Sequence, residues 1–218
     1  MSLSLLREFC AENFTDVPAA IEAGADRIEL CDNLAVGGTT PSAGVIGAAT
    51  VYAHEHGARV MTMIRPRGGD FVFGPAELQM MQSDIETACR LGTDGIVFGC
   101  LERREHGFWL DLSAIEALVA RVRWMQDQRD WSGVPREFDR EDQRIDITFH
   151  MAFDELAPED QFEAIDVLVK MGVTRILTHG GPAGTPIDGN LPRLRELIAY
   201  ANGRLTILPG AGITYENA

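Results

Sequence analysis

Two arginines in a short, stiff motif could bind an anion. Arg65 and Arg67 stand on either side of Pro66 and are followed by two glycines. The proline fixes its own backbone and favours an extended residue before it, and glycines let a ligand approach the backbone closely. Because a guanidinium forms paired hydrogen bonds with carboxylates and phosphates, we predict that both arginines bind a small anionic molecule. For Arg67, a surface ion pair with Asp70 is the alternative.

Two cysteines could bind a soft metal ion. Cys10 and Cys31 each end a predicted strand, with matching parity. Neighbouring parallel strands lie roughly 4.8 Å apart, so the two thiolates could bind an ion such as Cu(I). Burial of both as small core residues is the alternative. Cys100 is a further candidate sulfur, whereas Met61 and Met63 are interpreted as core residues.

Three carboxylates and one histidine could act as general acids and bases. Alternate residues of a strand face the same side, so Glu8, Glu29 and His150 are expected on one side of the sheet. Asp154 follows shortly after the strand of the histidine. Carboxylates beside an imidazole can transfer protons or hold a hard divalent metal ion. We predict a catalytic role for His150, with the three carboxylates as its partners or as metal ligands.

Two glycine-rich turns could complete an anion site. They follow the last two predicted strands and contain Gly180, Gly181, Gly210 and Gly212. Backbone N–H groups gathered in such turns bind anions. We predict that they face Arg65, although an ordinary tight turn between a strand and a helix is the alternative.

A repeated pattern indicates the elements that position these residues. Five glycines each follow an amphipathic stretch and precede a short apolar run: Gly24, Gly57, Gly92, Gly172 and Gly203. Glycine after a helix and before a strand is typical of βα units. Units that recur about every 30 residues indicate a parallel sheet.

The predicted strands are Leu6–Cys10, Arg27–Cys31, Arg59–Ile64, Gly95–Phe98, Ile145–His150, Thr174–Thr178 and Leu205–Leu208. The predicted helices are Thr15–Ala23, Ser42–His56, Pro75–Leu91, Leu112–Gln126, Pro158–Met171 and Leu191–Ala201. This unchanging pattern favours an α/β fold of the TIM-barrel-like (β/α) type over a doubly wound sheet. The site is then expected at the carboxyl ends of the strands.

Two irregular regions affect the predicted barrel. Residues 127–144 form an overlong, charge-mixed segment, interpreted as an inserted loop within a single domain, 1–218. The sequence ends after the seventh predicted strand, so the last βα unit is expected to be missing or incomplete. An exposed strand edge needs a cover, which favours a homodimer or a higher homo-oligomer.

Composition argues against several classes of partner. The chain has 218 residues, with 19 Lys and Arg against 33 Asp and Glu, and a net charge of −14. This balance argues against binding to nucleic acid or to an anionic membrane. No apolar run approaches the roughly 18 residues that span a membrane. The 4 cysteines are too irregularly spaced for a disulfide framework, so we predict reduced thiols and a cytoplasmic location.

Several motifs together resemble the CutC copper homeostasis family. They are Glu8-Phe9-Cys10, Glu29-Leu30-Cys31, Gly37-Gly38-Thr39-Thr40-Pro41-Ser42, Ile64-Arg65-Pro66-Arg67-Gly68-Gly69-Asp70-Phe71, Thr148-Phe149-His150-Met151-Ala152-Phe153-Asp154 and Pro209-Gly210-Ala211-Gly212. The resemblance covers nearly the whole chain and implies a TIM-barrel-like, cytoplasmic, commonly oligomeric protein that binds Cu(I). The sequence departs from the family at Met151, where many members carry Arg, and at His179, where many carry Ser. It also departs in the 127–144 segment and in the absent closing βα unit.

Two functions follow as hypotheses. The first is copper homeostasis, with Cys10 and Cys31 as the ligands of Cu(I). The second is a TIM-barrel enzyme that acts on a small anionic substrate, such as a phosphorylated one, with His150 as acid and base. Both require charged and sulfur-bearing side chains from separate strands to converge at one end of the barrel.

Overall fold

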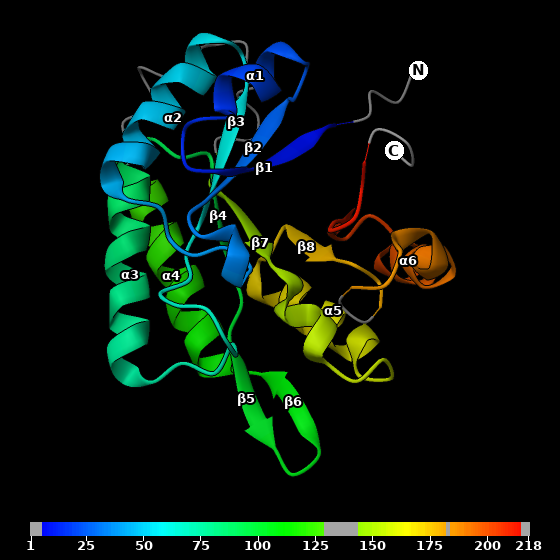
Figure 1. The fold of residues 1–218 in the computed structure, drawn as a ribbon. Coiled ribbons are helices and arrows are strands. Elements are labelled where there is room, and N and C mark those ends of the chain that lie inside the picture. Colours follow the sequence, from blue (N-terminus) through cyan, green and yellow to red (C-terminus); the bar gives the residue numbers. More distant parts are fainter. Residues whose placement is uncertain (1–5, 129–143, 182–183, 215–218) are drawn as a thin grey trace. The chain divides into compact units, whose positions relative to one another are not determined.

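The computed structural model describes residues 6–128, 144–181 and 184–214 (Figure 1). Contacts divide the chain into two compact units. The first unit comprises the described residues of Met1–Asp70, Gly74–Val97 and Ala120–Asp146. The second comprises those of Phe71–Phe73, Phe98–Val119 and Ile147–Ala218. Each unit is described below by itself.

The first unit is built on parallel strands in the order β1-β2-β3-β4. These strands are β1 (Glu8–Glu12), β2 (Arg27–Cys31), β3 (Arg59–Met63) and β4 (Gly95–Phe98), the last of which passes into the second unit at Phe98. All residues of β2 and β4 are buried. Burial on both faces is typical of parallel strands that helices cover.

Helices α1 (Val17–Glu22), α2 (Ala43–Glu55) and α3 (Pro75–Arg90) connect these strands. Their starts are encoded locally. The Ser42 hydroxyl accepts a 3.3 Å hydrogen bond from the Val45 N–H at the start of α2, as an N-cap side chain should. Pro75 opens α3, where its missing N–H costs nothing, and Glu77 accepts a 2.8 Å bond from the Gly74 N–H.

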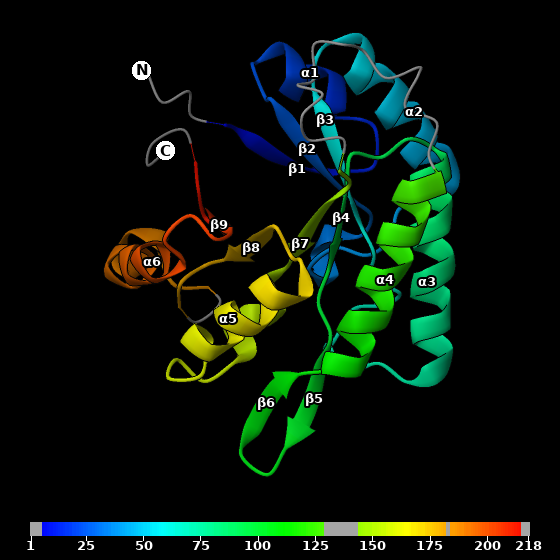
Figure 2. The ribbon, with the colours of Figure 1, turned by 180° about the vertical axis from the view of Figure 1, so that it is seen from behind.

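Helix α4 (Leu112–Gln128) begins in the second unit and ends in the first. Its C-terminal half lies beside α3, as both ribbon views show (Figures 1 and 2). Arg121 of α4 reaches two residues of α3 from there, Gln82 at 3.3 Å and Glu86 at 3.1 Å. No helix in the described part of the chain is long and apolar enough to cross a membrane.

The second unit has parallel strands in the order β7-β8-β9, namely β7 (Asp146–Phe149), β8 (Arg175–Thr178) and β9 (Thr206–Pro209). Only Asp146 of β7 belongs to the first unit. A 3-10 helix, η4 (Met151–Glu155), and the helices α5 (Gln161–Met171) and α6 (Ile187–Ala201) follow the strands. Helix α5 ends at Met171, and the φ of 84° at Gly172 suits the left-handed position after a helix.

An antiparallel hairpin of β5 (Leu101–Arg104) and β6 (Gly107–Leu110) forms a separate two-stranded sheet in this unit. The sequence analysis did not predict it. Arg103 and Arg104 lie over the rings of Phe108 and Trp109, 5.1 and 5.0 Å from the ring centroids. Such pairings of cation and ring stabilise a hairpin that has few buried residues.

The predicted parallel βα pattern is confirmed, with local shifts. The first strand covers Glu8–Glu12 instead of Leu6–Cys10, and α6 begins at Ile187 instead of Leu191, with Pro192 inside it. Helix α5 begins at Gln161 instead of Pro158. Of the predicted 127–144 insertion, residues 129–143 lie outside the described residues.

Candidate functional site

Strand register places sulfur and carboxylate side chains in two rows within the first unit. Cys10 pairs with Glu29, which pairs with Met61 on β3. Glu12 pairs with Cys31, two residues further along. Because alternate residues of a strand share a face, both rows point to the same side of the sheet.

The two predicted copper ligands meet. Their Sγ atoms, in Cys10 and Cys31, lie 3.9 Å apart. One ligand atom from each of Cys10, Glu29 and Cys31 lies within 4.8 Å of the others. The sequence analysis gave Glu29 a catalytic role and missed its place beside the sulfurs. The Glu-x-Cys spacing carried that signal, since residues two apart in a strand face the same way.

The three groups of this cluster shift one another's pKa values. The pKa of Cys10 is lowered, chiefly because its sulfur accepts a hydrogen bond from the Cys31 thiol. The pKa of Cys31 is raised well above its usual value by that same bond and by burial. Burial also raises the pKa of Glu29, and the negative charge of Cys10 adds to this effect. Of the two thiols, Cys10 is therefore the one that loses its proton more readily.

The donor set fits a soft metal ion. Thiolate ligands select Cu(I) and zinc over harder cations. Cys10 is exposed, which leaves a path for an ion, whereas Cys31 and Glu29 are 1% and 6% exposed. The buried Glu29 Oε1 atom has no hydrogen-bond partner among the described residues. A buried polar atom in that condition costs free energy, and a bound group would remove the cost.

Glu8 lies outside this cluster at the start of β1. Its carboxylate forms an ion pair with Arg27, which is buried at the start of β2. The pair joins the two strands where their parallel ladder begins. This arrangement makes Glu8 a structural residue of the first unit, and the catalytic role predicted for it stays a prediction.

Arg65 organises the loop over Cys31. Its guanidinium donates to three backbone carbonyls, those of Val36 at 2.8 Å, Gly38 at 3.0 Å and Gly69 at 2.7 Å. A side chain at Gly38 would place its first carbon 3.1 Å from the Cys31 sulfur. The arginine therefore holds the Val36–Gly38 backbone against the sulfur. Burial lowers the pKa of Arg65, and the prediction that it binds an anionic ligand stays a prediction.

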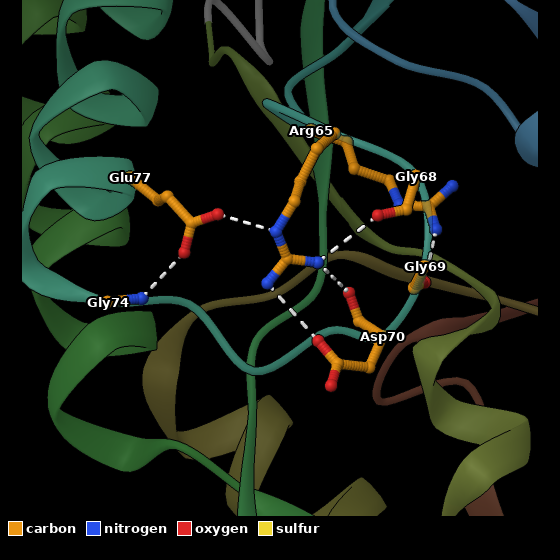
Figure 3. Close-up of polar contacts among 7 residues, drawn as sticks. Arg65, Gly68, Gly69, Asp70, Gly74 and Glu77 are labelled. Atoms are coloured by element: carbon orange, nitrogen blue, oxygen red, sulfur yellow. Dashed lines mark hydrogen bonds and ion pairs between the residues drawn. The ribbon is translucent and has the colours of Figure 1, made fainter.

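Arg67 is held by residues of its own loop and of α3 (Figure 3). It donates to Glu77 at 2.5 Å, to the Asp70 carboxylate at 3.2 Å and to the Gly68 carbonyl at 3.1 Å. The Glu77 bond is the main reason why the pKa of Arg67 is raised. The surface ion pair with Asp70 that we gave as the alternative is therefore present. An anion-binding role for this arginine stays a prediction.

His150 has a defined tautomer in the second unit. Its Nδ1 accepts a 3.1 Å hydrogen bond from the Ala152 N–H at the start of η4, so the neutral ring carries its proton on Nε2. The ring is 3% exposed and lies 4.9 Å from the ring of Phe71. Gly99 makes room for it, because a first side-chain carbon there would lie 2.5 Å from the imidazole.

Asp154 ties η4 to the end of β8. Its carboxylate accepts from the Thr178 hydroxyl and, at 2.9 Å, from the His179 N–H. Burial nevertheless raises its pKa, because the loss of water outweighs these bonds. These contacts show a structural role for Asp154 and leave its predicted catalytic role a prediction.

The glycine turns of the second unit have packing reasons of their own. The Gly180 and Gly210 N–H groups donate to the hydroxyl and the carbonyl of Thr178, at 2.9 and 3.0 Å. A first side-chain carbon at Gly181 would lie 2.4 Å from Asn190, and one at Gly210 would lie 2.3 Å from Leu177. Gly212 has a φ of 80°. The ordinary tight turn is thus present, and the anion site predicted for these glycines stays a prediction.

His179 connects the two turns, which the sequence did not suggest. Its Nδ1 lies 3.0 Å from the Ala211 carbonyl and 3.2 Å from that of Gly210, and its Nε2 lies 2.7 Å from the Thr185 carbonyl. These contacts join segments up to 32 residues apart. A long-range contact of this kind leaves no local pattern in the sequence.

The predicted site residues divide between the units. The first unit holds Glu8, Cys10, Glu29, Cys31, Arg65 and Arg67. The second holds His150, Asp154, Gly180, Gly181, Gly210 and Gly212. Cys100 is also in the second unit, and burial raises the pKa of its thiol. Within the first unit the predicted proximity of the two cysteine sulfurs is confirmed. Their binding of a metal ion and the convergence of all these residues on one site stay predictions.

Comparisons with known proteins identify close relatives. Residues 5–126 and 134–218 match the CutC family. A CutC family protein of Enterococcus faecalis is 55% identical over 213 residues, which cover 98% of this chain and 91% of that protein. The human copper homeostasis protein cutC homolog is 36% identical over 212 residues, covering 97% of this chain and 67% of that protein.

Solved structures agree with the fold. The crystal structure of the putative copper homeostasis protein CutC from Streptococcus agalactiae has a TM-score of 0.84 and 45% identity, covering 98% of this chain and 90% of that one. Deoxyribose phosphate aldolase from Aeropyrum pernix has a TM-score of 0.57 at 12% identity, covering 95% and 76%. The latter likeness shows the fold alone. The TIM-barrel-like class of parallel βα units is thereby confirmed.

Proposed function

Because the chain belongs to the CutC family, we propose that it serves copper homeostasis by holding Cu(I) between Cys10 and Cys31. Copper is here the cargo of the protein. The proposal includes a cytoplasmic location, where cysteines stay reduced. All 4 cysteines of the chain are free thiols, which is consistent with such a compartment.

The observation that carries the proposal is the 3.9 Å separation of the two Sγ atoms. Thiolates at this distance can share one ion, and soft sulfur ligands favour Cu(I). The pKa of the exposed Cys10 is lowered by the hydrogen bond from Cys31, so its sulfur is the better placed of the two to make the first bond to an arriving ion. The buried Cys31 then loses its proton as the second bond forms.

Anaerobic Cu(I) titration against a competing chelator tests this function. We expect one ion per chain for the wild type and no high-affinity ion for the C10S/C31S double variant. C89S is the matched control, because Cys89 is a buried cysteine of α3 outside the cluster. An unchanged stoichiometry in the double variant would refute the proposal.

A second candidate function is an enzyme that acts on a small anionic molecule. The observation that favours it is His150, a buried imidazole whose backbone bond at Nδ1 leaves its Nε2–H as the donor. A neutral histidine in this state can polarise a carbonyl or protonate a leaving group. Isothermal titration with phosphate and with carboxylic acids, comparing wild type and H150Q, tests it. Equal heats for both proteins would count against this function.

We also propose that the protein forms a homo-oligomer through β1. In the described part of the chain, β1 pairs with β2 alone, and Leu6 and Phe9 beside this edge are 48% and 42% exposed. An unpaired strand edge is a template for pairing with another copy. Light scattering on a size-exclusion column should give a multiple of 23.9 kDa for the wild type and a smaller particle for F9K.

A further inference from the structure

We propose that Met63 supplies a third sulfur to the Cu(I) ion, through its thioether. This inference rests on the copper-binding function proposed above and adds a ligand to it. The metal would then be held by two thiolates and one thioether, all from the first three strands of the first unit.

The separation of the two cysteine sulfurs leaves room for a third ligand. A metal–thiolate bond is about 2.3 Å long, so two sulfurs on opposite sides of an ion would lie about 4.6 Å apart. Three sulfurs at the corners of a triangle around the ion would lie about 4 Å apart with the same bond length. The Sγ–Sγ distance of 3.9 Å, at which one thiol donates to the other, is compatible with such a triangle.

The register of β2 and β3 places Met63 beside Cys31. Leu30 pairs with Thr62, and the next residue on each strand is the cysteine and the methionine respectively. Both have the same parity and therefore point to the same face. Both are also nearly inaccessible to water, with exposures of 1% and 4%.

Gly38 brings the two sulfur-bearing side chains onto one surface. A first side-chain carbon there would lie 3.1 Å from the Cys31 sulfur and 3.7 Å from the Met63 methyl carbon. The two side chains thus pack against the same glycine and share one buried cluster. Methionine is unbranched and has three rotatable bonds, so its sulfur can turn toward an ion without moving the backbone.

Two competing ligands fit less well. Glu29 offers a carboxylate oxygen, which is a hard ligand and suits Cu(I) poorly. Met61 pairs with Glu29, and Glu29 pairs with Cys10, so Glu29 lies between the methionine and the cysteine. The Met61 sulfur also lies toward β4, because a first side-chain carbon at Gly95 would be 2.3 Å from it. Met63 is therefore the soft ligand that the register provides.

X-ray absorption at the copper edge, on protein that contains selenomethionine, tests the assignment. Selenium scatters more strongly than sulfur, so a copper–selenium shell would distinguish a methionine ligand from the cysteines. We expect this shell in the wild type and in M61L and M81L, and its loss in M63L. Met81 is a fully buried methionine of α3 outside the cluster, and M81L is the matched control.

Chelator competition gives a second readout on unlabelled protein. M63L should bind Cu(I) roughly tenfold more weakly or worse, comparable to the loss of a partner that orients a metal ligand. M61L and M81L should bind like the wild type. Leucine keeps the volume and apolar character of methionine, so thermal unfolding of the three variants should be similar.

The outcomes separate the two proposals. If the wild type holds no copper that depends on Cys10 and Cys31, the copper function itself is wrong. If it holds such copper without a selenium shell, or if M61L instead of M63L removes the shell, only the assignment of Met63 is overturned. If M63L does not fold, absence of the shell from the labelled wild type, or its loss in M61L, still overturns the assignment.

Discussion

Two clusters differ in whether their polar atoms have hydrogen-bond partners: Cys10, Glu29 and Cys31 of the first unit, and Asp154 and His179 of the second. In the second unit, Asp154 and His179 bond to backbone and hydroxyl groups of neighbouring turns. In the first, the Glu29 Oε1 atom has no hydrogen-bond partner among the described residues, and Cys10 is exposed. Native proteins satisfy most buried polar groups, so an unpartnered one needs an explanation, of which a bound group is one.

Residue types that can do chemistry do not by themselves identify a functional site. Asp154 and the glycines Gly180 and Gly210 have the types of an active site, yet their polar groups hold turns together. Strand register places the Cys10 and Cys31 sulfurs 3.9 Å apart, close enough for both to contact one metal ion. Mutations should therefore affect stability mainly in the second unit and binding mainly in the first.

The largest stability effect is expected for D154A. It removes the acceptor of the Thr178 hydroxyl and of the His179 N–H, and bonds to a charged acceptor contribute most. We expect a loss of about 3 kcal/mol in urea unfolding. E155A is the control, because Glu155 is the exposed next residue of η4. A loss of Cu(I) affinity without a loss of stability would contradict the structural role.

R65K should show an intermediate effect on both properties. Lysine keeps the charge but cannot reproduce three bonds to carbonyls on separate segments. We expect about 2 kcal/mol less stability. Because Arg65 holds Gly38 against the Cys31 sulfur, chelator competition should also show weaker Cu(I) binding. Binding equal to that of the wild type would mean that the loop does not shape the site.

E29Q should gain stability at neutral pH. Burial raises the pKa of Glu29 above its ordinary value of 4.5, so the folded protein binds this proton more tightly than the unfolded chain. Wild-type stability should therefore fall as the pH rises from about 4.5 to the folded pKa, and level off above it. Glutamine has no such proton, so this part of the fall should vanish and E29Q should be more stable at pH 7 by about 1 kcal/mol. Urea unfolding from pH 4 to 8 measures the difference; parallel curves would contradict it.

The smallest effect is expected for R67A. Its ion pairs with Glu77 and Asp70 are partly exposed, with 39% of the arginine side chain accessible to solvent. Pairs of this kind contribute at most about 1 kcal/mol. Copper binding should be unchanged, and thermal unfolding should show a small shift that salt reduces. A large loss of phosphate binding in R67A would instead support the predicted anion site.

Short-range patterns made much of the fold and the sulfur pair predictable. The glycines that end helices and the apolar runs after them located the parallel strands of both units. The two-residue alternation of strands placed Cys10 and Cys31 on one face. These predictions needed only the geometry of a helix end and of a strand.

Long-range contacts account for what sequence reasoning missed. Arg65 bonds to carbonyls 27 and 29 residues away in the chain, which no local pattern reveals. His179 bonds to a carbonyl 32 residues away. The β5–β6 hairpin has a charged first strand, Leu101–Arg104, with little apolar alternation. Its pairing depends on contacts between rings and guanidiniums that no periodicity reveals.

Gly38 provides space beside the Cys31 sulfur, whereas the strands provide the sulfur itself. Its φ of 84° and its missing side chain leave the volume next to the Cys31 sulfur empty of protein atoms. A methyl group at that position would lie 3.1 Å from this sulfur and 3.7 Å from the Met63 methyl carbon, so it would crowd both side chains. The access that we propose for Cu(I) therefore depends on an absent carbon atom.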